Sequence, residues 1–120
     1  MSGREHWLPR LKPLGARVEI PYRRQLTVDE TAALRAGLWP RDMDERWIVF
    51  LSDSALGIHR SWSGNAIYSL PRSISVDGAD VLGPLFVSDD IAEYRRGDSA
   101  RDIEMVDSLI AKTVERSRKT

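Results

Sequence analysis

The stretch ERWIVFLSDSALGIHRSWSGNAIYSL, residues 45–70, decides the fold because two short polar turns divide it into three apolar runs. Short runs rich in Val, Ile, Tyr and Trp and bounded by Ser, Asp, Gly and Asn are typical of β-strands joined by hairpins. We therefore predict a three-stranded antiparallel meander over residues 45–71.

Counting outward from the first turn predicts the strand pairing. If residues 53 and 54 form a two-residue turn, the opposite pairs are Leu51 and Leu56, Val49 and Ile58, Trp47 and Arg60, and Glu45 and Trp62. Arg60 then lies between two indoles on an apolar face, with Glu45 as a diagonal neighbour. Because a buried cation without a partner is costly, we expect cation–π contacts and an ion pair with Glu45 to satisfy the guanidinium.

The second turn leaves two registers open. A three-residue loop over residues 63–65 places Tyr68 opposite Arg60 and completes an aromatic surround, whereas a two-residue turn places Tyr68 opposite Ser61. In both registers His59 and Ser61 point away from Arg60, because successive side chains of a strand alternate. This alternation argues against a His–Ser nucleophile pair. We also expect His59 to be half-exposed, so that its removal costs little stability.

The chain before the meander predicts an edge strand and one short helix. Residues 16–26 have extended character and contain Pro21, which restricts them to a sheet edge. Thr27 and Glu30 occupy the two positions of a capping box, and Gly37 suits the residue that follows a helix. A helix is therefore expected over the nine residues that precede Gly37.

After the meander, residues 73–78 and 81–88 predict short strands, and residues 89–97 predict a brief helix. The last segment predicts a long helix with Ser99 and Asp102 at capping-box positions. Apolar residues recur along it at helical spacing and form one stripe for the sheet: Ile103, Val106, Leu109, Ile110, Thr113 and Val114.

These elements predict a single α+β domain over residues 16–120, preceded by an irregular N-terminal arm over residues 1–15, which contain two prolines. The expected architecture is a mostly antiparallel twisted sheet with a central meander, packed against a C-terminal helix and one or two short helices. Strands and helices are segregated along the chain rather than alternating, which favours this architecture over a parallel, doubly wound sheet.

Composition narrows the classes of function. The 120 residues carry a formal net charge of zero, which argues against a broad nucleic-acid surface. The chain has no cysteine, so it has no disulfide, thiol nucleophile or Cys-ligated zinc, and no apolar run suggests a signal peptide or a membrane span. We expect a cytoplasmic protein without a membrane partner. Its two histidines, His6 and His59, lie far apart in sequence, so neither a metal nor another cofactor is predicted.

The central motif resembles that of a known group of proteins. The stretch PRDMDERWIVFLSDSALGIHRSWSGNAIYSL, followed by VSDDIAEYRRGDSARDIEMVDSLI, is similar to a small, uncharacterised bacterial protein family with the core motif RW, F, HRSW(S/T)G and IY. The resemblance covers residues 40–110 and is specific in HRSW-G-IY, although members have more aromatic residues where this chain has SALGI. It implies that residues 59–62 and Gly64 act as a unit, and it implies no activity.

Two functions of different classes remain open. The first is a small binding or interaction module, in a bacterial defence or regulatory system, that recognises a protein partner or a small anionic ligand. The residues expected to form its site are His59, Arg60, Ser61, Trp62, Trp47 and Tyr68.

The alternative is an enzyme that acts on a phosphorylated or nucleotide-like, ADP-ribose-type small molecule. In this hypothesis Arg60 holds the anion, Trp62 stacks on the ring, and His59 or Asp44 transfers a proton. An enzyme needs such an acid or base to converge on the ligand of Arg60. Arg60 can equally be a structural cation that is paired with a nearby carboxylate. The sequence leaves the oligomeric state open.

Overall fold

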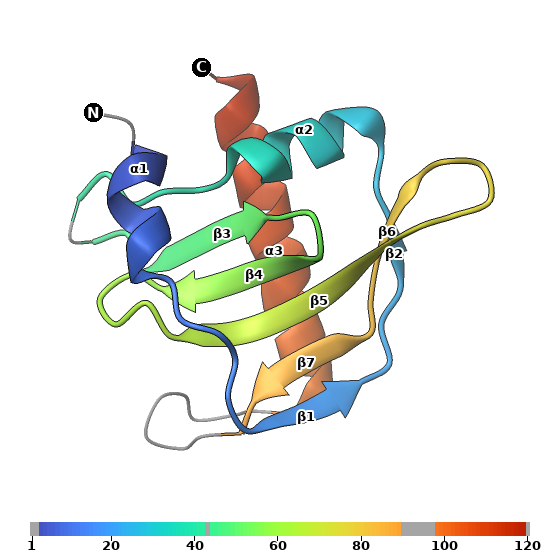
Figure 1. The fold of residues 1–120 in the computed structure, drawn as a ribbon, viewed down its shortest axis with the longest axis horizontal. Coiled ribbons are helices and arrows are strands. Elements are labelled where there is room, and N and C mark those ends of the chain that lie inside the picture. The colour runs from blue at the N-terminus through green and yellow to red at the C-terminus, as the bar shows by residue number, and fades with distance from the viewer. Residues whose placement is uncertain (1–2, 43, 90–97, 120) are drawn as a thin grey trace.

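The computed structural model describes residues 3–42, 44–89 and 98–119 and shows the predicted α+β fold (Figure 1). All paired strands of its sheet are antiparallel. The main path runs in the order β1 (Arg17–Ile20), β7 (Leu85–Ser88), β5 (Ala66–Ile74), β4 (Ala55–Arg60) and β3 (Trp47–Leu51). Off this path, β2 (Arg24–Gln25) pairs with β6 (Asp80–Leu82), which also pairs with the outer part of β5.

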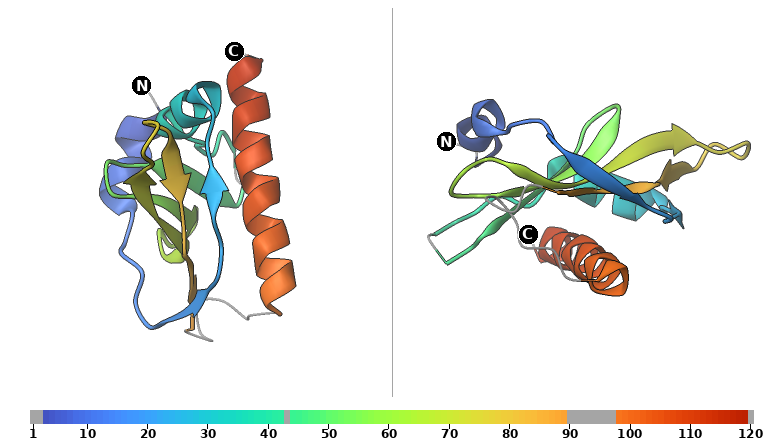
Figure 2. Two further views of the ribbon diagram at one scale, coloured as in Figure 1. Left: turned by 90° about the vertical axis from the view of Figure 1, so that its right-hand side faces the viewer. Right: turned by 90° about the horizontal axis from the view of Figure 1, so that it is seen from below.

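The helices lie on both sides of the sheet. The long helix α3 (Ser99–Arg118) covers one face, and the short α1 (Gly3–Trp7) lies on the opposite side (Figure 2). The helix α2 (Val28–Ala36) packs against α3 and the edge strand β3. Among the described residues, no helix is both long and apolar enough to cross a membrane.

The predicted stripe on α3 packs into the core. Val106 and Ile110 are fully buried, and Leu109, Thr113 and Val114 are also buried against the sheet. The N-terminal cap differs from the prediction by one residue, because the carboxylate of Asp98 accepts the backbone N–H of Arg101 at 2.8 Å. The capping box predicted at Ser99 and Asp102 is therefore wrong.

Pairing between β3 and β4 follows the predicted register. Trp47 lies opposite Arg60, Val49 opposite Ile58, and Leu51 opposite Leu56. The capping box of Thr27 and Glu30 also forms as predicted, and Gly37 follows the helix with a φ of 88°. Among the described strands, β1 pairs with β7 alone, at the predicted edge position.

Pairing between β4 and β5 follows neither predicted register. Tyr68 lies opposite Ile58, and a β-bulge then shifts the pairing so that Ala66 lies opposite His59. The bulge leaves Ile67 as the extra residue of β5. The predicted pair of Glu45 and Trp62 required Trp62 to lie in β4. The strand instead ends at Arg60, and Trp62 belongs to the following turn.

The first fifteen residues were predicted to form an irregular arm, but part of this arm is helical. A 3-10 turn (Leu8–Arg10) follows α1, and Lys12 then donates its backbone N–H to the carbonyl of Gly64 at 2.9 Å. Gly64 has a φ of 77°, and a Cβ there would collide with the carbonyl oxygen of Arg10. Glycine at this position therefore lets the arm dock against the turn between β4 and β5.

The remaining predicted elements are found in part. Residues 73–78 divide between the end of β5 and a turn, and residues 81–88 divide between β6 and β7. The predicted helix over residues 89–97 lies, apart from its first residue, outside the described residues.

Candidate functional site

The four residues of the HRSW motif point to different surroundings. His59 is buried on the arm side of the sheet, whereas Arg60 packs on the α3 side. Ser61 ties the turn to the start of β3, and Trp62 is 73% exposed. The motif therefore does not form one convergent set of side chains.

Arg60 packs against the indole of Trp47, as predicted. The guanidinium carbon lies 4.3 Å from the centroid of that ring, which is cation–π geometry. The second aromatic neighbour in this cluster is Tyr68, whose ring is stacked on Trp47 with centroids 6.2 Å apart. Exposed Trp62 does not provide the second indole, so the predicted pair of indoles around Arg60 is wrong.

Tyr68 connects this cluster to α3. Its side chain is fully buried, and its hydroxyl donates to Oδ1 of Asp102 at 3.1 Å. Glu45, the predicted partner of Arg60, instead binds Arg116 through both carboxylate oxygens, each at 2.9 Å. These hydrogen bonds hold the pKa of Glu45 below its usual value. Both carboxylates thus fix α3 to the sheet.

His59 is a buried residue and not the half-exposed one that we expected. Its side chain is 8% exposed, and its Nδ1 lies 3.0 Å from the carbonyl oxygen of Gly64. The ring covers Gly57, where an added Cβ would lie only 2.7 Å from Nε2. Burial lowers the pKa of His59, which favours the neutral imidazole. The side chain therefore braces the turn between β4 and β5, whose Gly64 carbonyl also accepts the N–H of Lys12 from the arm.

Neither of the two candidate acid or base residues, His59 and Asp44, converges on Arg60. His59 points to the opposite face of β4, and Asp44 is exposed in the loop before β3. The backbone N–H of Asp44 donates to the carboxylate of Asp42 at 2.9 Å, which is a turn contact. Among the described residues, no three His, Asp or Glu side chains are grouped so that they could hold a metal ion.

Trp62 lines a hollow of about 300 Å³ that we call the indole hollow. Ser61 holds its wall in place, because its N–H donates to the carbonyl of Arg46 at 2.9 Å and its hydroxyl donates to the carbonyl of Glu45 at 3.0 Å. The residues that line the indole hollow are Trp7, Pro40, Arg41, Asp42, Ser61 and Trp62.

Sequence reasoning found only Ser61 and Trp62 of this lining. Trp7 belongs to the arm and reaches Trp62 because the arm docks on Gly64. Pro40, Arg41 and Asp42 belong to the loop after α2, in which the backbone N–H of Arg41 donates to Glu45. No periodicity or spacing marks such a contact. The nearest signal in the sequence is Gly64 itself, since a glycine in a turn permits a close approach of another backbone.

Two further hollows adjoin the indole hollow through Arg41. One, of about 260 Å³, lies beside Trp39 and Arg116 and shares Pro40 and Arg41 with the indole hollow. The other, of about 310 Å³, we call the basic hollow, and it is lined by Arg41, Lys112, Glu115, Arg116 and Lys119. Arg41 is thus common to an aromatic and a cationic concave surface.

Comparison with known proteins finds no matching family model, no matching curated protein and no matching solved structure. The resemblance of residues 40–110 to a bacterial family therefore stays a prediction.

Proposed function

We propose that this protein is a small binding module and that the indole hollow is its recognition site. The single observation that carries the proposal is the 73% exposure of Trp62 at the edge of that hollow. Tryptophan is one of the largest apolar side chains, and in binding surfaces it provides rigid contact area at a small cost in conformational entropy.

The turn that carries Trp62 is held in place without a ligand. Ser61 binds the carbonyl of Glu45, the amide of Gly64 donates to the carbonyl of Arg60 at 2.8 Å, and Lys12 binds Gly64. A turn anchored from both sides presents its exposed side chain in one position. Such preorganisation lowers the cost of binding, which supports a role in recognition.

The lining of the hollow suits a ligand that contains a planar ring. Two indoles and Pro40 supply apolar surfaces, while Arg41 and Asp42 supply one charge of each sign. A volume of about 300 Å³ is at the lower end of the range for small-molecule pockets, and an indole face can stack on a base or another planar ring.

His59 and Arg60 act as supports in this proposal. They fix the hairpin from its two faces, and neither needs to contact the ligand. The enzymatic alternative receives less support, because proton transfer by His59 to a ligand of Arg60 requires side chains that point to the same side of β4. We therefore favour binding without catalysis.

A thermal-shift screen with adenosine, guanosine and ADP-ribose tests the proposal, because a ligand that binds only the folded state raises its apparent stability. Affinity for each ligand that raises the melting temperature is then measured by quenching of tryptophan fluorescence. We expect Trp62→Ala to weaken binding about ten-fold or more, which is typical of a central aromatic contact.

The matched control is Val76→Ala, since Val76 is also an exposed apolar residue but lies in the hairpin between β5 and β6. This variant should bind as the wild type does, and both variants should keep the wild-type melting temperature. The proposal fails if none of the three ligands stabilises the protein, or if Trp62→Ala retains full affinity.

A further inference from the structure

We propose that the basic hollow is a binding site for an oxyanion of the phosphate-ester class, with Arg41 as the side chain that contacts it. The site lies between the last turns of α3 and the loop after α2. It adjoins the indole hollow, but its lining is charged instead of aromatic.

The charges around the basic hollow are unequal. Four cationic side chains line it, whereas the carboxylates in contact with them are Glu115 and Glu45. Glu45 neutralises Arg116 through a two-pronged hydrogen-bonded pair, and Glu115 pairs with Lys119 at 3.1 Å. Arg41 and Lys112 remain: in the described part of the chain neither side chain forms a salt bridge, although the charge of Lys112 helps to lower the pKa of Glu45.

The helix dipole accounts for only part of this cluster. Cations in the last turn of a helix are favoured by the partial negative charge of its C-terminus, which explains Arg116. Arg41 belongs to a different segment, the loop after α2. The backbone N–H of Arg41 donates to Oε2 of Glu45 at 3.2 Å and so fixes the position of this loop. The same carboxylate thus orients Arg116 and brings Arg41 beside it.

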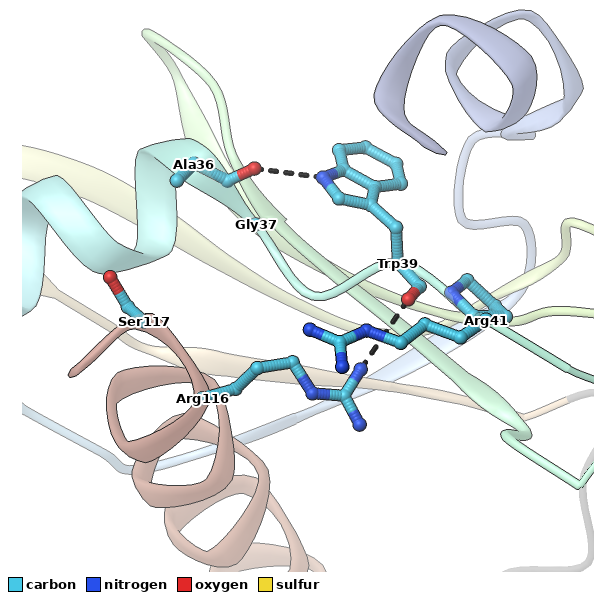
Figure 3. A pocket seen from close by; sticks show the side chains of 7 residues that line it. Ala36, Gly37, Trp39, Arg41, Arg116 and Ser117 are labelled. Carbon is cyan, nitrogen blue, oxygen red and sulfur yellow. Dashed lines mark hydrogen bonds between the residues drawn. The ribbon is translucent and has the colours of Figure 1, made fainter. Parts of the chain in front are cut away.

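Figure 3 shows the side chains of Arg41 and Arg116 reaching toward the hollow beside Trp39, which both residues line. Two positive charges that line one hollow repel each other. A bound oxyanion would reverse this repulsion, because the planar guanidinium fork matches the geometry of phosphate and carboxylate oxygens. Lys112 adds positive charge without fixed geometry.

Phosphate esters fit better than simple carboxylates because Arg41 and Lys112 form no salt bridge with any described residue. A phosphate group carries up to two negative charges and three acceptor oxygens, so it can be shared between Arg41 and Lys112. Arg41 also lines the indole hollow, and a ligand that spans both hollows would place its phosphate at Arg41 and its ring at Trp62. This last step rests on the proposed function, whereas the oxyanion site itself does not.

Three probes separate the two sites: pyrophosphate, adenosine and ADP, each titrated into the full chain by calorimetry at low salt. Pyrophosphate tests the basic hollow, adenosine tests the indole hollow, and ADP tests both together. We expect Arg41→Gln to weaken pyrophosphate binding about ten- to one-hundred-fold, the usual effect of losing a hydrogen bond between charged groups. Trp62→Ala should leave pyrophosphate binding unchanged.

A matched control removes one positive charge elsewhere on the same helix. Arg101 is exposed in the first turn of α3, so Arg101→Gln should bind pyrophosphate as the wild type does. Lys112→Gln provides a second variant of the site and should weaken pyrophosphate binding by a few-fold. Added salt should weaken the binding of pyrophosphate but not that of adenosine, because exposed charges are screened.

The proposal is overturned if pyrophosphate does not bind, or if Arg41→Gln and Arg101→Gln bind it equally. Binding of pyrophosphate that depends on Arg41, together with failure of adenosine to bind, would support the oxyanion site and reject the proposed role of the indole hollow. ADP binding that is weakened by both Arg41→Gln and Trp62→Ala would support one ligand that spans the two hollows.

Discussion

Replacing His59 tests whether this imidazole is a buried part of the fold. The side chain is 8% exposed, bonds to the carbonyl of Gly64 at 3.0 Å and covers Gly57. His59→Ala removes a hydrogen bond worth about 1 kcal/mol and leaves a cavity beside the arm. We therefore expect the free energy of unfolding to fall by about 2–4 kcal/mol, in the range of large-to-small core substitutions.

The same residue makes stability depend on pH in a defined direction. Burial lowers the pKa of His59 from its ordinary value of 6.5, so the unfolded chain takes up a proton at a higher pH than the folded chain does. The stability contribution is therefore complete above pH 6.5 and is lost as the pH falls from there toward the folded-state pKa. The loss has a limiting slope of about 1.4 kcal/mol per pH unit.

Denaturant titration followed by tryptophan fluorescence, at about pH 8 and about pH 5.5, measures this loss. His59→Gln should lose less stability between the two pH values than the wild type does, because glutamine does not titrate. His6→Gln is the matched control, since it makes the same substitution at the exposed histidine of α1. If His59→Gln showed the full wild-type pH dependence, the burial argument would be refuted.

Three further substitutions test the packing that positions the site. Ile110→Ala should lower the free energy of unfolding by about 2–5 kcal/mol in urea titration, whereas exposed Arg118→Ala should be nearly neutral. Gly64→Ala should lower the free energy of unfolding by at least about 2 kcal/mol more than Gly78→Ala does. Both glycines have positive φ, but of these two Gly64 is the one in contact with the arm, so equal costs would argue against that contact. Arg60→Lys should cost about 1 kcal/mol, since an ammonium stacks less well on the indole below it, and an unchanged thermal unfolding midpoint would contradict this.

Part of the fold was predictable because local rules act directly on it. The alternation of apolar residues and the two-residue turn were enough to pair Trp47 with Arg60 and Val49 with Ile58. Pairing residues outward from a turn one by one fails where a strand contains an extra residue. The bulge at Ile67 therefore displaced Tyr68 from both expected registers. Bulges have no strong local signature, so the sequence alone could not place Tyr68.

The candidate site was less predictable because it depends on contacts between distant segments. The alternation rule correctly placed His59 on the face opposite Arg60, but it could not show that the arm would cover that face. Arg41 was missed for the same reason, since its position depends on Glu45, which in turn pairs with Arg116 near the C-terminus. The cap at Asp98 left Asp102 available for Tyr68, a contact that capping rules do not foresee.

The strand β5 joins two regions of very different burial. Its first residues, Ala66 to Tyr68, are buried between β4 and β7, whereas Ile74 at its end is 65% exposed in the hairpin that projects from the domain (Figure 1). Amide hydrogen exchange should therefore divide this one strand. The amides near Ile74 should exchange through local opening of the hairpin, while that of Tyr68 should exchange only when the whole domain unfolds. The hairpin can then fray repeatedly while the strands that position Trp62 and Arg60 stay paired.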